Sequence, residues 1–284
     1  MISIIVCSVN QTLLTQLKKN IQNTIGVEHE VIAIDNLVKN YSLAHAYNEG
    51  AAQAKYPFLC FLHEDILLHT NNWGQALINH LSDTSVSLVG ILGCIVKTHS
   101  PSGVYIPIDE LNRINQLQRR KDNGTDHYYK NPFNEIYSEV ATVDGMFLAV
   151  TRQNHNSYPF DEDTLTGFHA YDVDYSLGQA KNGKVVIVYD ILIEHFSYGG
   201  NTRQWIDAQL LVSKKWDKQL PRHIHLSQAE LKQAEIINLE TFLGALYINK
   251  YKKLLQLKYL FKLIALRPFS TRNFYLLAKL FLIW

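Results

Sequence analysis

The chain has 284 residues, of which 47% are hydrophobic and 11% aromatic, and its formal net charge is +1. This composition supplies a sizeable core and excludes a disordered chain, and the length suits one α/β domain of about 200 residues with an appendage. The charge is unevenly distributed, because eight basic residues and no acidic residue follow Glu240.

The cysteines and the N-terminus indicate in which cellular compartment the protein is located. Cys7, Cys60 and Cys94 lie inside apolar runs, which is typical of buried thiols in a reducing environment. The N-terminus has no basic region, the apolar run at 2–9 is short for a signal peptide, and no stretch approaches 18 consecutive apolar residues. We therefore expect a cytoplasmic protein without a membrane-spanning segment.

Apolar runs and stretches with helical spacing alternate along the first hundred residues. We expect strands at 2–7, 31–34, 58–62 and 87–95, and helices at 13–25, 43–55 and 73–81. Gly26 stands where the first helix would stop. Strands and helices in this order, with short connections, are typical of an open, mostly parallel sheet, which binds ligands beyond the carboxyl ends of its strands.

The second half of the chain is less regular. Residues 98–139 have no clear period, which predicts a functional or mobile loop. We then expect order at 140–150, a helix at 172–181 and a strand at 185–188. The sequence Ser227-Gln-Ala-Glu230 is a capping box that opens a long helical tail, and Pro268 breaks this tail.

Charged side chains follow two of the expected strands. Asp35 comes after the second strand, and His63-Glu64-Asp65 comes after the third. Oxygen ligands suit magnesium and manganese, so the triplet is a candidate site for a divalent cation that holds a diphosphate. The alternative is a surface turn whose acids cap the following segment.

Three further groups of residues are candidates for catalysis or ligand binding. Asp144 and Gly145 interrupt an apolar run, Asp172 and Asp174 stand at a helix start, and His195 precedes a glycine-rich segment. A carboxylate at a helix start suits a general base, and a glycine allows close approach to a ligand. The alternatives are a β-bulge at 144–145, helix capping by the two aspartates and a structural hydrogen bond from the histidine.

Over residues 1–200 the order of these motifs resembles that of the family-2 glycosyltransferases, which share the GT-A fold. Asp35 stands where this family has an acid that holds the nucleotide, and Asn48-Glu49-Gly50 matches its Asn-x-Gly helix. The resemblance implies an α/β GT-A fold, in which a mostly parallel central sheet is flanked by helices and followed by a C-terminal helical extension.

The resemblance also implies roles for individual residues. It implies that Asp172 is the catalytic base, that a Mn²⁺ or Mg²⁺ ion is held by Asp65, His63 and His195, and that substrates contact Asp35, Asn48, Asp144, Gly145 and Asp174. Two positions depart from the family pattern. His63 replaces the first acid of the metal motif, and Tyr171 replaces the usual glutamate beside the base.

The implied reaction transfers a sugar from a nucleotide-diphosphate donor to a hydroxyl of a glycan or lipid-linked acceptor, with inversion and with a metal ion. A sugar nucleotidyltransferase is one alternative, although residues 8–11 contain neither the glycine nor the lysine expected of its phosphate loop. A non-catalytic scaffold that kept the fold and binds nucleotide sugar is the other, supported by the substitutions at His63 and Tyr171.

We expect a catalytic domain at 1–222 and a basic, amphipathic helical extension at 223–284. Between 242 and 284 the basic residues are interspersed with leucines and aromatic residues. This pattern predicts binding to the anionic inner face of a membrane, as in enzymes of this family that build surface polysaccharides. The alternative is a tail that packs on the catalytic domain or on a second copy, and the apolar content argues against nucleic acid.

Overall fold

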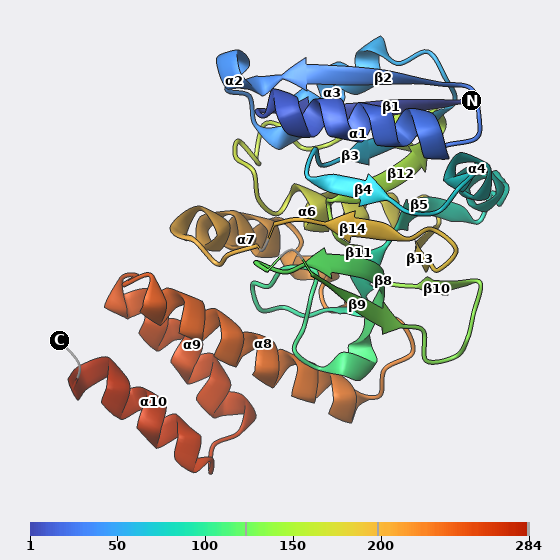
Figure 1. Cartoon of the computed structure of the whole chain (residues 1–284). Coiled ribbons are helices and arrows are strands. Elements are labelled where there is room, and N and C mark those ends of the chain that lie inside the picture. Colours follow the sequence, from blue (N-terminus) through green and yellow to red (C-terminus); the bar gives the residue numbers. More distant parts are fainter. Residues whose placement is uncertain (123, 198, 283–284) are drawn as a thin grey trace.

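A seven-stranded sheet forms the centre of the molecule (Figure 1) in the computed structural model, which describes residues 1–122, 124–197 and 199–282. Its strand order is β10 (Tyr137–Glu139), β13 (Lys184–Val188), β5 (Val86–Gly90), β12 (Phe147–Thr151), β3 (Phe58–Leu62), β1 (Ile2–Ser8) and β2 (His29–Asp35). β1 pairs in parallel with β2 and β3, whereas β12 runs antiparallel to both of its neighbours. The sheet of this α/β fold is therefore mixed, and its parallel part includes the predicted N-terminal strands.

Helices cover both faces of this sheet. α1 (Gln11–Thr24) and α4 (Trp73–Ser82) bury their apolar residues on one face, and α3 (Leu43–Gln53) and α6 (Tyr171–Gln179) bury theirs on the other. α1 is capped by Asn10, whose side chain accepts hydrogen bonds from two backbone N–H groups of the first turn. It ends before Gly26, whose φ of +71° is the left-handed conformation predicted for a helix stop. Two short helices, α2 (Asn36–Lys39) and α5 (Arg152–Ser157), follow β2 and β12.

A second sheet lies beside the first. Its order is β11 (Thr142–Val143), β6 (Leu92–Cys94), β8 (Asn112–Arg119), β14 (Ile193–His195) and β4 (Ile66–Leu68), and β9 (Thr125–Lys130) also pairs with β8. A third, two-stranded sheet joins β7 (Val96–Lys97) to β15 (Arg222–His223). The single strand expected at 87–95 is divided between β5 in the first sheet and β6 in the second.

The prediction of an irregular segment at 98–139 was wrong for Asn112–Arg119 and Thr125–Lys130, where β8 and β9 form an antiparallel pair, whereas 98–108 has neither helix nor strand. The apolar alternation that marks a strand is absent, since β8 buries polar side chains instead. Asn115, for example, donates its amide to the backbone oxygens of Tyr189 and Ile191. Such hydrogen bonds offset the cost of burying polar groups, and they leave no signature in the sequence.

Helices make up the C-terminal part of the chain (Figure 1): α7 (Arg203–Lys215), α8 (Gln228–Ile248), α9 (Lys253–Leu266) and α10 (Thr271–Leu282). The predicted capping box at Ser227 and Glu230 is confirmed. The helical tail breaks at 249–252 as well as near Pro268, and Trp284 lies outside the described residues. In the part of the chain that is described, no helix has both the length and the apolar character needed to cross a membrane.

α8 packs on the body of the protein. Phe242 is buried 6.4 Å from the ring of Trp205 in α7 and 4.8 Å from that of Tyr259 in α9, measured between ring centroids. Asn238 donates a 2.9 Å hydrogen bond to the hydroxyl of Thr98. The predicted boundary at 222/223 falls within β15, and the helices that follow it share a core with α7.

Asp174 fastens α6 to the C-terminal end of α7. Its side chain is fully buried, and its carboxylate lies 2.7 Å from the ammonium of Lys215, 2.7 Å from the indole nitrogen of Trp216 and 3.1 Å from the hydroxyl of Tyr158. The substrate contact predicted for Asp174 therefore does not fit the structure, because these partners enclose both carboxylate oxygens. The sequence pattern of two acids at a helix start did not distinguish this buried anchor from its neighbour Asp172.

Replacing Asp174 by alanine should lower the free energy of unfolding by about 3 kcal/mol, because Lys215 and Trp216 lose a buried partner. We expect the midpoint of thermal unfolding to fall by roughly 6–12 °C. The exposed Asp163 provides a matched control, and Asp163→Ala should unfold within about 1 °C of the unmodified protein. Equal midpoints for the two variants would contradict this role.

Candidate active site

The site lies where several strands of the two sheets end. In the parallel register Ser8 of β1 is opposite Asp35 of β2, and Val6 is opposite Leu62 of β3. The end of β3 is extended by a hydrogen bond of 3.1 Å from the backbone N–H of His63 to the oxygen of Met146. This bond brings the turn before β12, with Asp144 and Gly145, to the same edge as His63.

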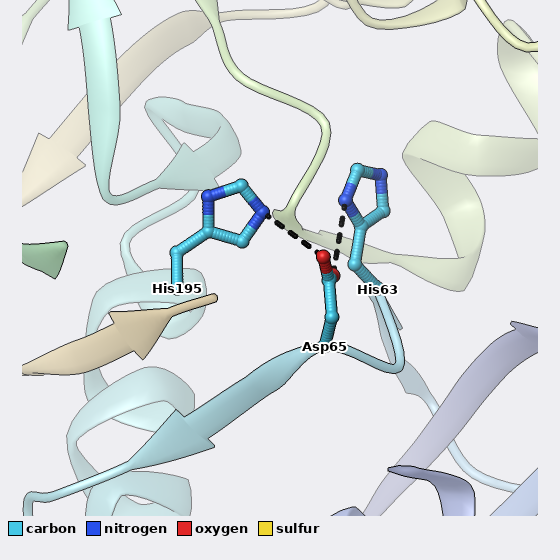
Figure 2. A group of neighbouring side chains, drawn as sticks. All are labelled: His63, Asp65 and His195. Atoms are coloured by element: carbon cyan, nitrogen blue, oxygen red, sulfur yellow. Dashed lines mark ion pairs between the residues drawn. The ribbon is translucent and has the colours of Figure 1, made fainter. Parts of the chain in front are cut away.

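His63, Asp65 and His195 gather at this edge, as Figure 2 shows. Nδ1 of His63 lies 3.9 Å from one carboxylate oxygen of Asp65, and Nε2 of His195 lies 3.6 Å from the other. One ligand atom from each residue falls within 4.8 Å of the others. Ligands about 2.1 Å from a common ion lie roughly 3–4 Å apart, so the three residues lie near the spacing that a divalent metal ion needs.

The ring of His63 is fixed by Tyr171, the first residue of α6. Its Nε2 forms a 2.7 Å hydrogen bond with the Tyr171 hydroxyl. Burial lowers the pKa of His63, against the opposing effect of the Asp65 carboxylate. The hydroxyl also lies over Gly145, where an added Cβ atom would come within 1.9 Å of it. Glycine is therefore required at 145 for Tyr171 to reach His63.

Asp172 occupies the first turn of α6. One carboxylate oxygen accepts a 2.9 Å hydrogen bond from the N–H of Val173, and the other accepts a 3.3 Å bond from the N–H of Gly145. Burial, followed by the charge of Asp144, raises the pKa of Asp172 to about 7. The helix begins after Ala170, whose φ of +64° is uncommon for a residue with a side chain. Such strained backbone is frequent beside functional groups.

A cavity of about 530 Å³ joins these residues. Its lining includes His63, His195, Asp144, Gly145 and Asp172, and this volume is within the range of small-molecule sites, roughly 300–1,000 Å³. The structure therefore brings together most of the predicted site residues. Asp65 lies against the two histidines, although it is not among the cavity-lining residues described.

Two predicted substrate contacts lie elsewhere. Asp35 shares the strand-end edge but is exposed, and its carboxylate accepts a 3.2 Å bond from the N–H of Leu37 as the cap of α2. Asn48 donates to the backbone oxygen of Phe160 at 2.9 Å and accepts from its N–H at 3.1 Å. Neither side chain is among the described residues that line the cavity, and a substrate contact for each stays a prediction.

Glu64, the middle residue of the triplet, bonds to the end of β1 and the loop after it. Its carboxylate accepts hydrogen bonds from the Ser8 hydroxyl at 2.6 Å and from the N–H groups of Val9 and Asn10. Glu64 therefore holds the loop after β1 against the end of β3. The polar residues Ser8, at the end of β1, and Glu64, two residues beyond β3, were the only sequence signal for this contact.

Sequence reasoning missed one wall of the cavity. This wall contains Tyr105, Trp205, Gln209, Asn238 and Thr241, which come from the segment before β8, from α7 and from α8. These residues form no motif, and two of them lie in the tail that was predicted to be separate. These residues are distant from Asp172 in the sequence, and they line the same cavity only in the folded chain.

Comparisons with known proteins show the family and the fold of this chain. The sequence matches a glycosyltransferase-like family over residues 3–237. A comparison with curated protein sequences gives no match.

The solved structures that are similar to this chain include GalNAc-T7 and TarS. GalNAc-T7 with UDP, GalNAc and Mn²⁺ superposes with a TM-score of 0.52 at 11% identity, over 82% of this chain and 54% of that one. TarS 1-349 of S. aureus in complex with UDP superposes with a TM-score of 0.51 at 14% identity, over 87% of this chain and 71% of that one. The present chain thus spans about half the length of the GalNAc-T7 chain.

At these identities the structural likeness shows the fold, which is that of the GT-A glycosyltransferases. The sequence match is independent of it and covers most of the chain, from β1 into α8. Together with the cavity at the strand ends, these findings identify the chain as a member of the glycosyltransferase-like family.

Proposed function

We propose that this protein transfers a sugar from a nucleoside diphosphate donor to a hydroxyl group of a glycan or lipid-linked acceptor, with inversion of the anomeric configuration. The observation that carries the proposal is the position of Asp172 in the cavity, with its pKa raised to about 7, beside His63 and His195. The UDP in the structures of GalNAc-T7 and TarS supports a nucleotide-sugar donor.

In this reaction Asp172 acts as the general base. It takes the proton of the acceptor hydroxyl while the acceptor oxygen forms a bond to the anomeric carbon. The bond from that carbon to the diphosphate breaks on the opposite face, and the diphosphate leaves with the electron pair. A base with a pKa near the working pH is well matched to this step, and the N–H groups of Val173 and Gly145 orient its carboxylate.

We also propose that His63, Asp65 and His195 hold a divalent metal ion. When bound, this ion would neutralise negative charge on the leaving diphosphate. Two imidazoles and one carboxylate favour Mn²⁺ over Mg²⁺, which prefers oxygen ligands, and the GalNAc-T7 structure contains Mn²⁺. With Nδ1 of His63 as the ligand atom, its Nε2–H donates to Tyr171, as ring nitrogens opposite a metal commonly do.

Asp172→Asn should lower the rate of sugar transfer by about 10²–10⁴-fold, because the amide cannot accept the proton. The affinity for UDP should stay within about threefold, since the change removes no proposed ligand of the metal or nucleotide. In the unmodified enzyme, kcat/KM should fall as the pH drops below about 7, because Asp172 becomes protonated. Asp144→Asn should move this acid limb to lower pH by removing the neighbouring negative charge.

Asp163→Asn, at an exposed position, is the matched control for the transfer assay and should leave the rate unchanged. Near-normal transfer by Asp172→Asn would show that the base is another residue. UDP binding without sugar release from any donor would favour the scaffold alternative. Formation of a nucleotide sugar from a nucleoside triphosphate and a sugar phosphate would favour the nucleotidyltransferase alternative.

Removing the metal ion with a chelator should abolish transfer, and Mn²⁺ should restore it better than Mg²⁺ does. His63→Ala and His195→Ala should weaken Mn²⁺ binding by at least about tenfold, because each removes a ligand. Titration of the paramagnetic resonance signal of free Mn²⁺ measures this binding without an activity assay. His127→Ala, whose side chain bonds Asn115 away from the cavity, is the control, and equal Mn²⁺ affinity in all variants would contradict the assignment.

The exposed face of α9 supports a proposal of peripheral binding to an anionic membrane. Its buried residues pack towards α8, so only the other side of α9 is left to meet a membrane. Leu254, Lys258, Phe261 and Lys262 remain exposed on one side of α9. Lysines beside exposed apolar residues are suited to a membrane interface, where a lipid-linked acceptor of polysaccharide synthesis would lie.

Changing both Lys258 and Lys262 to glutamate should weaken binding to phosphatidylglycerol vesicles by at least about 30-fold, since each lysine contributes roughly 1 kcal/mol. Co-sedimentation with these vesicles, and with vesicles of phosphatidylcholine alone, provides the measurement. Changing the exposed Lys18 and Lys19 of α1 to glutamate alters the net charge equally and should have little effect. Equal losses for the two double variants, or no sedimentation of the unmodified protein, would contradict membrane binding by α9.

A further inference from the structure

The wall of the cavity formed by the 101–107 segment, α7 and α8 has no part in the proposed metal site or general base. Two aromatic residues of this wall, Tyr105 and Trp205, lie in the cavity lining, and Tyr105 is 50% exposed. Polar side chains from α7 and α8 accompany them, namely Gln209, Asn238 and Thr241. The wall thus combines flat apolar surfaces with hydrogen-bonding groups.

Gln209 is the most unusual member of this wall. It is only 2% exposed, and its Oε1 atom has no hydrogen-bond partner among the described residues. Buried polar atoms of native proteins are nearly always paired, so one that is unpaired beside a cavity points to a ligand. A carbonyl oxygen accepts hydrogen bonds, and the missing partner is therefore a donor such as a hydroxyl group.

Hydrogen bonds from Lys97 and from Glu235 of α8 hold the 99–102 segment in place. Lys97 is fully buried, and its ammonium donates to the backbone oxygen of Ser100 at 2.9 Å and to the hydroxyl of Ser102 at 3.0 Å. The carboxylate of Glu235 in α8 accepts hydrogen bonds from the Ser100 hydroxyl and from the N–H of His99. The segment that carries Tyr105 is therefore tied to the helix that carries Asn238, and the wall is preorganised for a ligand.

A pyranose ring has the chemistry that this wall would recognise. Its C–H faces are apolar and pack on aromatic rings, while the hydroxyl groups at its edge need buried hydrogen-bond partners. We propose that the wall is the subsite for a pyranose unit of the acceptor, with Gln209 accepting a hydrogen bond from one of its hydroxyls and Tyr105 packing against its face. This assignment rests on the proposed function, because Asp172 in the same cavity would receive the proton of another hydroxyl.

The test compares Gln209→Ala and Tyr105→Ala with matched controls. Gln204 is an exposed glutamine of α7, and Tyr128 is a 48% exposed tyrosine of β9; neither is among the described residues of the cavity lining. Saturation-transfer NMR is recorded with the methyl glycosides of glucose, galactose, N-acetylglucosamine and rhamnose, with and without UDP and Mn²⁺. The UDP affinity of each variant is measured separately by calorimetry.

We expect at least one glycoside to receive saturation from the unmodified protein, and Gln209→Ala and Tyr105→Ala to weaken its binding about tenfold, as loss of one hydrogen bond or stacking contact would. Gln204→Ala and Tyr128→Ala should bind it normally, and UDP affinity should be unchanged in all four variants. Thermal unfolding confirms that each variant is folded, and Gln209→Glu provides a second substitution that retains a buried hydrogen-bond acceptor.

Two results would overturn the subsite. One is the absence of saturation of every glycoside, and the other is weaker UDP binding in Gln209→Ala and Tyr105→Ala, which would assign the wall to the donor. Failure of the unmodified protein to bind UDP would instead contradict the proposed function. The glycoside measurements without UDP would then still decide whether the wall binds a sugar.

Discussion

The antiparallel pairing of β14 with β4 is the constraint on which the site depends. It places His195 opposite Ile66, so that the last residue of β14 meets Asp65, which immediately precedes β4. A shift of one residue would turn His195 to the other face of the sheet. The preceding residue, Glu194, points to that other face, where its buried carboxylate bonds Arg119 at 2.6 Å and His69 at 3.0 Å. These bonds fix the register that brings His195 to Asp65 and His63.

The two departures from the family pattern, His63 and Tyr171, are partners in the structure. A histidine in place of an acid needs a hydrogen bond to fix its ring, and the phenol hydroxyl in place of a second carboxylate provides one at 2.7 Å. Replacing two acids by two neutral groups also reduces the negative charge buried beside Asp144 and Asp172. Viewed separately, each substitution looks like the loss of a functional residue, whereas together they form one contact.

The sequence predicted those parts of the fold that local spacing encodes. The leucines and isoleucines of α1 recur at helical intervals, and the hydrophobic run of β1 marks a buried strand, so both were found. The β8–β9 pair was missed because buried polar side chains hide the strand period. Asp172 and Asp174 both lie in the first turn of α6, and only Lys215 and Trp216, at the C-terminal end of α7, distinguish the buried anchor from the cavity residue.

The place of α8 in the cavity wall determines when in folding the site is complete. The bond between Asn238 and Thr98 joins positions 140 residues apart, and closing so long a loop costs more chain entropy than pairing neighbouring strands. On the ribosome, β1, β2 and β3 can pair as soon as residues 1–62 have emerged. The cavity gains Thr241 only after most of the chain has been synthesised. A nascent chain therefore contains Asp172 and the proposed metal ligands before it has a closed pocket around them.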